Sequence, residues 1–135
     1  MRQDAQLVRE SFELIREMAI PTAMLFYGRL FDMDPSLRGL FHVDFKAQSV
    51  KLMDTLSLVV ESADRLDQLR PTLRDLGRRH VDYGVQPQHY QTVSTALIWA
   101  LAQAMQPDFY DDVRAAWTHI LDEVCREMLA GAERG

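Results

Sequence analysis

His80 is the residue of this sequence best placed to bind a metal. It follows Leu73 and Leu76 at helical spacing, so its imidazole extends the apolar face of a helix that Pro71 opens and that stops by Gly84. A histidine offered from the buried side of a helix can hold a metal or haem iron from one side. The alternative is a core histidine bonded to a backbone carbonyl, which this stretch alone favours.

Two further polar side chains are predicted to face the interior. Tyr27 shares one helical face with Leu30 and Phe31, so its hydroxyl needs a buried partner, for which a backbone carbonyl is the simplest choice. Gln48 lies three residues after Phe45 and four before Leu52. Its amide is therefore expected either at the wet rim of that face or against a bound group that needs a hydrogen bond.

The composition predicts a single globular domain over residues 1–135. Hydrophobic residues make up 47% and charged residues 26% of the chain, which is long enough to bury a core without disulfides. The net charge of -5 disfavours nucleic acid and anionic membranes as partners. Cys125 is the only cysteine, and no leader or membrane-spanning apolar run is apparent. We expect a soluble, cytoplasmic protein in which Cys125 is a small core residue.

Helical periodicity runs through the chain, and no alternating strand pattern of useful length occurs, so the fold is predicted to be all-α. The expected helices cover residues 4–19, residues 21 to about 33, a segment entered through residues 42–48, the His80 segment after a link at 62–70, a long run after Pro87, and roughly 110–130. Motifs for nucleotide binding, covalent c-type haem, di-iron bundles and helical zinc proteases are absent.

The order of these features resembles the single-domain bacterial globins, which share a lineage with the globin half of flavohaemoglobins. The resemblance rests on Tyr27 in a proline-started helix, PSLRGLF ending at Phe41, Gln48, KLM at 51–53 and LGRRHVDYGVQPQHY at 76–90. It covers essentially the whole chain. It implies a globin fold of about six to eight helices around a haem pocket.

The resemblance also implies a role for each matching residue. His80 would be the proximal ligand of the iron of a non-covalent haem b, and Phe41 would pack on the porphyrin. Tyr27 and Gln48 would form a polar distal pair, and Tyr90 would approach the proximal histidine. The remaining apolar contacts would come from Leu52, Leu76, Val85 and Val93. Lys51, Arg78 and Arg79 either meet the haem propionates or form a solvated face.

The sequence departs from the flavohaemoglobin pattern near its end. Leu121 stands four residues after Trp117, where that pattern has a tyrosine, and Ala132 stands where it has a glutamate. Glu133 is adjacent to Ala132 and could take over that role. A glutamate here would make the proximal histidine more electron-rich, so its displacement weakens the case for strong peroxidase-like or dioxygenase chemistry.

The expected function is reversible binding or transport of dioxygen, with carbon monoxide and nitric oxide as further ligands. Enzymatic detoxification of nitric oxide is a second expectation, and it would require an outside reductase. A haem-based gas sensor and a cofactor-free helical interaction module are the alternatives. No role is assigned to His89 or His119, and His42 could approach the haem edge or the iron only if its corner rearranged.

Overall fold

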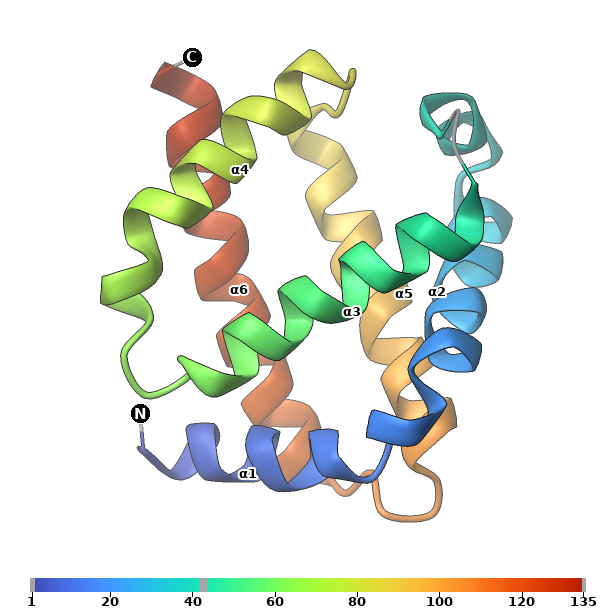
Figure 1. Cartoon of the computed structure of the whole chain (residues 1–135), viewed down its shortest axis with the longest axis vertical. Helices are drawn as coiled ribbons and strands as arrows, with labels where there is room; N and C mark the ends of the chain where they lie inside the picture. Colours follow the sequence, from blue (N-terminus) through green and yellow to red (C-terminus); the bar gives the residue numbers. More distant parts are fainter. Residues whose placement is uncertain (1, 42–43, 135) are drawn as a thin grey trace.

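The computed structural model describes residues 2–41 and 44–134, and within them every regular element is a helix (Figure 1). Its α-helices are α1 (Arg2–Glu13), α2 (Ala19–Met33), α3 (Phe45–Glu61), α4 (Arg70–Asp82), α5 (Pro87–Met105) and α6 (Asp111–Arg134). Three short 3-10 helices join them, namely η1 (Arg16–Met18), η2 (Pro35–Leu40) and η3 (Leu66–Leu69). The all-α prediction is confirmed.

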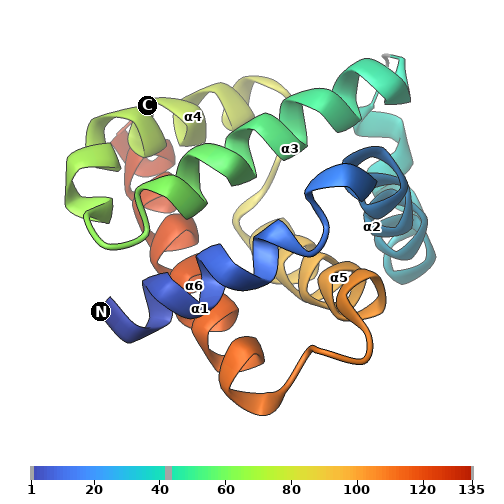
Figure 2. The same ribbon diagram turned by 60° about the horizontal axis from the view of Figure 1, so that its bottom comes forward.

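The helices cross one another at steep angles around one core. In Figure 1, α3 and α4 lie in front of the long helices α5 and α6, and α1 runs across the bottom. Figure 2 shows α1 from below, passing close to α6. The principal packing pairs are α4 on α6, α2 on α5, α1 on α6 and α2 on α3. None of the described helices is long and apolar enough to cross a membrane.

Trp117 is the centre of the contact between α1 and α6. Its side chain is fully buried, its ring lies 6.2 Å from that of Phe12, and its indole N–H donates to the Ser11 hydroxyl over 2.9 Å. A buried indole needs such a partner, and Ser11 supplies it. The apolar stripe of α6 is buried, and it comprises Val113, Trp117, Ile120, Leu121, Val124 and Met128.

The prediction of one continuous helix over residues 4–19 is wrong. The first helix ends at Glu13, where the amides of Leu14 and Ile15 turn back to carbonyls three residues earlier. The second helix then starts at Ala19, which places Pro21 in its first turn. A proline is accepted in the first turn of a helix, but in a helix interior it clashes with the carbonyl four residues earlier, which here is that of residue 17. The first helix therefore does not continue unbroken into the second. Residues 16–18 form a 3-10 turn in its place.

Candidate functional site

The imidazole of His80 is held by its own helix. It lies near the end of α4, half-buried, with Nδ1 2.7 Å from the carbonyl oxygen of Leu76. That contact requires Nδ1 to carry the proton, which leaves Nε2 as the lone-pair nitrogen. Burial lowers the pKa of His80, an effect that the bond to Leu76 partly opposes. A neutral imidazole with a fixed tautomer is the form that ligates a metal.

The chain folds back on His80 directly after α4. Gly84 has φ +91°, and its N–H donates to the carbonyl of Val81 over 3.0 Å. The N–H of Val85 donates to the carbonyl of His80 over 2.9 Å. These two bonds satisfy the last carbonyls of the helix in a Schellman arrangement, for which glycine is suited because it has no Cβ. The turn thereby ties the predicted pocket residue Val85 to His80 through the backbone.

Tyr27 lies at the middle of an aromatic cluster. Its side chain is 4% exposed, and its ring centroid lies 4.9 to 6.3 Å from those of four phenylalanines, Phe26, Phe31, Phe41 and Phe45. The hydroxyl donates to the backbone carbonyl of Gln48 over 3.4 Å, which is long for an O–H donor. Burial raises the pKa of Tyr27 to about 12. The predicted pair is therefore close in space, through the backbone of Gln48.

In the first half of α3, the predicted inner face is not the most deeply buried one, although Leu56 and Val59 further along the same face are buried. Phe45, Gln48 and Leu52 are half-buried. Ser49 and Met53, each one residue later in the sequence, are buried. Ser49 lies against α2, where its hydroxyl is 3.8 Å from the sulfur of Met24. Contact with α2 thus decides the deepest face, and the Gln48 face lies beside it at the edge of the core.

The apolar residues predicted to touch a haem share this intermediate burial. The apolar ones pack against the core without being fully enclosed, and they are Phe41, Leu52, Leu76, Val85 and Val93. They come from the corner after η2, from α3, from α4 and the turn after it, and from α5. A flat apolar group that covered these side chains would remove apolar surface from water and so lower the free energy of the protein. These five side chains are therefore suited to contact a haem, the group that the resemblance implies.

Tyr90 presents a buried hydroxyl without a hydrogen-bond partner in the described part of the chain. Burial, and then the proximity of Cys125, raise its pKa. The Sγ of Cys125 lies 3.3 Å from the hydroxyl of Ser94, and burial raises the pKa of this thiol. Tyr90, Val85 and Glu133 line one cavity of about 510 Å³ between the turn after α4 and the end of α6. Glu133 and Tyr90 thus border the same space, whereas Ala132 carries no polar group there.

The predicted basic residues lie at the surface. Arg78 and Arg79 both pair with Asp75, over 3.2 and 2.9 Å, and Lys51 is exposed on α3. The pairing of Arg79 with Asp75 could have been read from their spacing of four residues in a helix. The sequence reasoning overlooked it.

The other histidines have local roles or lie outside the description. The ring of His89 accepts the backbone N–H of Gln86 over 2.9 Å and so caps α5. His119 lies 3.1 Å from Asp4 and links α6 to α1. His42 lies outside the described residues.

The profile of the Globin family matches residues 25–128. This stretch includes α3 to α5 and the positions of Tyr27, Gln48, His80 and Tyr90. The chain therefore belongs to the Globin family.

Several relatives and solved structures are similar to the whole chain. The neuroglobins of Tetraodon nigroviridis and Danio rerio are each 27% identical over 143 residues, a match that covers 96% of this chain and 90% of theirs. An engineered carbene transferase made from RmaNOD, a proposed nitric oxide dioxygenase of Rhodothermus marinus, superposes with a TM-score of 0.88 at 25% identity and covers 99% of this chain and 94% of its own. A bacterial globin from Campylobacter jejuni gives a TM-score of 0.86 at 17% identity, covering 99% and 97%.

Proposed function

We propose that this chain is a single globin domain over residues 1–135 that binds non-covalent haem b through Nε2 of His80. The carrying observation is the 2.7 Å contact between His80 Nδ1 and the carbonyl of Leu76, because it fixes the ring and directs the other nitrogen's lone pair away from the helix. The half-buried set Phe41, Leu52, Leu76, Val85 and Val93 would cover the porphyrin faces. Lys51 and Arg79 would lie within reach of the propionates, in competition with Asp75 for Arg79.

Haem iron supplies reversible binding of diatomic gases. Tyr27 and Gln48 would be the polar side chains on the distal side. Dioxygen bound to ferrous iron would carry more negative charge than bound carbon monoxide, so it would gain more from their hydrogen bonds. The hydroxyl of Tyr27 is 3.4 Å from its present acceptor, so little is lost when it turns to donate to a ligand. The surrounding phenylalanines exclude water and strengthen that bond. We therefore assign reversible dioxygen binding or transport as the primary function, with carbon monoxide and nitric oxide as further ligands.

Nitric oxide detoxification is the second candidate. It is favoured by the similarity to a proposed nitric oxide dioxygenase and by the motif resemblance to the flavohaemoglobin lineage, including Hell's Gate globin and, more distantly, Vitreoscilla haemoglobin. The reaction joins dioxygen, nitric oxide and one electron to give nitrate, so an external reductase must deliver that electron each cycle. We place the protein and this partner in the cytoplasm. On the proximal side, the cavity that Tyr90 and Glu133 both line is the feature that would support turnover.

Absorption spectra of the purified protein test the haem assignment. The ferric, reduced and carbon-monoxide forms should each give a distinct Soret band in the wild type, and His80→Ala should lose or grossly alter it. His119→Ala is the matched control, because His119 is an exposed histidine on α6 whose contact is with Asp4. A wild type that takes up no haem on reconstitution would leave the cofactor-free interaction module as the better description.

Turnover separates the two gas functions. Repeated conversion of nitric oxide with a reductase and a limiting amount of protein would establish the enzyme. A single stoichiometric oxidation would leave only dioxygen binding, because any oxygenated globin is expected to react once. A gas sensor would instead change its association with a partner when the gas binds.

A further inference from the structure

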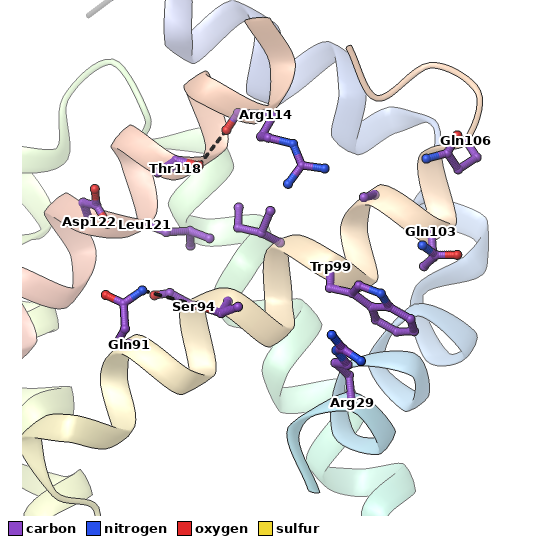
Figure 3. A pocket seen from close by; sticks show the side chains of 13 residues that line it. Arg29, Gln91, Ser94, Trp99, Gln103, Gln106, Arg114, Thr118, Leu121 and Asp122 are labelled. Atoms are coloured by element: carbon purple, nitrogen blue, oxygen red, sulfur yellow. Dashed lines mark hydrogen bonds between the residues drawn. The ribbon is translucent and has the colours of Figure 1, made fainter. Parts of the chain in front are cut away.

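A groove of about 400 Å³ lies between α5 and α6 on the outer side of the molecule, with Arg29 of α2 at one end (Figure 3). Leu121 and Ala102, both buried, form part of its floor. Figure 3 draws Arg114 and Arg29 on opposite sides of the Trp99 ring, whereas Asp122 and Gln91 lie toward the other end of the groove. The volume falls in the range of sites for small molecules, roughly 300 to 1,000 Å³.

Two arginines at this groove differ from most others in the chain. The arginines that carry a carboxylate partner within 4.0 Å are Arg9, Arg16, Arg65, Arg70, Arg74, Arg78, Arg79 and Arg126. Arg29, Arg38 and Arg114 have no such partner among the residues whose side chains are described, and each stacks on an aromatic ring. In a chain of net charge -5, two unneutralised arginines at one groove are an unusual concentration of free cations.

Stacking holds these arginines without using their hydrogen-bond donors. The Cζ of Arg29 lies 5.1 Å from the ring centre of Trp99, and that of Arg114 lies 5.0 Å from the ring centre of Phe109. A guanidinium held over a ring by cation–π attraction still has the N–H groups at its edges available for an acceptor. Those edges match a carboxylate or phosphate, which accept two parallel hydrogen bonds. The stacked arginines are thus partly ordered before a ligand arrives.

We infer that this groove is a binding site for a small organic anion, a phosphate monoester or a carboxylate, whose anionic group is attracted to the end of the groove that Arg29 and Arg114 flank. The amides of Gln103 and Gln106 border the same end and can donate further bonds. Ile98 and Trp99 offer apolar surface to the body of the ligand. Asp122 repels a second negative charge at the far end, so the ligand carries its charge at one end only. This site is separate from the proposed haem function.

Isothermal titration calorimetry of the purified protein tests the site with phenyl phosphate and benzoate as the anionic probes and phenol as the neutral one. Carbon monoxide is kept present, so that anions cannot be mistaken for ligands of iron. Saturable binding of an anionic probe, weakening as salt rises, is expected. Comparing phenyl phosphate with benzoate decides between the two anionic groups. Arg29→Gln and Arg114→Gln should both weaken binding, by about tenfold where the replaced arginine contacts the anionic group.

Arg38→Gln is the matched control, because Arg38 also stacks without a carboxylate partner but lies on Phe31, outside the groove. It should leave the affinity unchanged, and each variant is judged folded by its circular dichroism. No saturable binding by the wild type, equal binding of phenol, or an equal loss in Arg38→Gln would overturn the inference. Sedimentation showing a dimer that Arg114→Gln dissociates would also overturn it, because the groove would then be an interface between two copies.

Discussion

Gly77 of α4 lies against the backbone of Met128 of α6 so closely that a Cβ on Gly77 would stand 1.9 Å from the Met128 carbonyl oxygen. The reciprocal contact is equally close, because a Cβ on Gly131 would stand 2.0 Å from the carbonyl oxygen of Arg74. The two helices therefore cross with their backbones touching at two points. Since α4 also carries His80, the backbone of α6 sets the depth at which the proposed iron ligand lies.

Gly77→Ala should destabilise the protein by about 1 to 3 kcal/mol, the usual cost of overpacking. The added methyl group meets backbone, which cannot move aside as a flexible side chain would. Urea unfolding followed by circular dichroism measures the change. Gly28→Ala is the control, because Gly28 lies in α2 with nothing within 4 Å of its Cβ position, so this variant should gain about 0.5 to 1 kcal/mol. Equal effects of both substitutions would contradict the close crossing.

Glu127 should contribute measurably to the same helix pair. Its side chain is 11% exposed and accepts from the Nε atoms of Arg70 and Arg74, over 3.2 and 3.1 Å. Glu127→Ala would leave both arginines able to reach water, so we expect a loss of about 1 to 3 kcal/mol, less than for a fully buried pair. Glu123→Ala removes an exposed i,i+3 pair with Arg126 and should change stability by less than about 1 kcal/mol. Similar losses of stability in the two variants would argue against a contribution of Glu127 to the packing of α4 on α6.

Local patterns carried most of the fold. The apolar spacing of α4, α5 and α6 and the positions of Pro71 and Pro87 predicted where those helices lie, because periodicity and proline placement depend on nearby residues. The break after Glu13 was missed, since the same residues also fit a helix continuing toward Pro21. For the candidate site, the sequence predicted which residues take part but not which atoms they contact.

Contacts between distant residues could not be read from the sequence. Nothing near Gly77 or Gly131 shows that each touches a carbonyl on the other helix, and Glu127 gives no sign of its two arginines. The acceptor of the Tyr27 hydroxyl is a backbone carbonyl 21 residues away, which no side-chain pattern encodes. The roles of Tyr27, Gln48 and His80 toward haem stay predictions.

Tyr27 should titrate far above the usual value of 10.0, near 12, because burial opposes the phenolate. A pKa that is higher in the folded than in the unfolded chain stabilises the fold fully below pH 10, and this contribution is lost as pH rises from about 10 to 12. The melting temperature should fall less steeply over this window in Tyr27→Phe than in the wild type. Tyr83→Phe, at a tyrosine that is 62% exposed, is the control and should retain the wild-type slope. Identical slopes for all three proteins would place the Tyr27 hydroxyl in water.

Replacing Tyr27 and Gln48 should accelerate the release of dioxygen much more than the release of carbon monoxide. Tyr27→Phe combined with Gln48→Leu removes hydrogen bonds to a polar ligand, each worth about 1.5 to 3 kcal/mol, and so raises the dioxygen dissociation rate by roughly tenfold or more per bond. Carbon monoxide draws less charge and should change little. Tyr83→Phe again serves as the control, since its ring lies 5.9 Å from that of His80 and it carries an exposed hydroxyl. Stopped-flow displacement gives both rates, and an equal acceleration for the two gases would mean that the pair shapes the pocket without donating to the ligand.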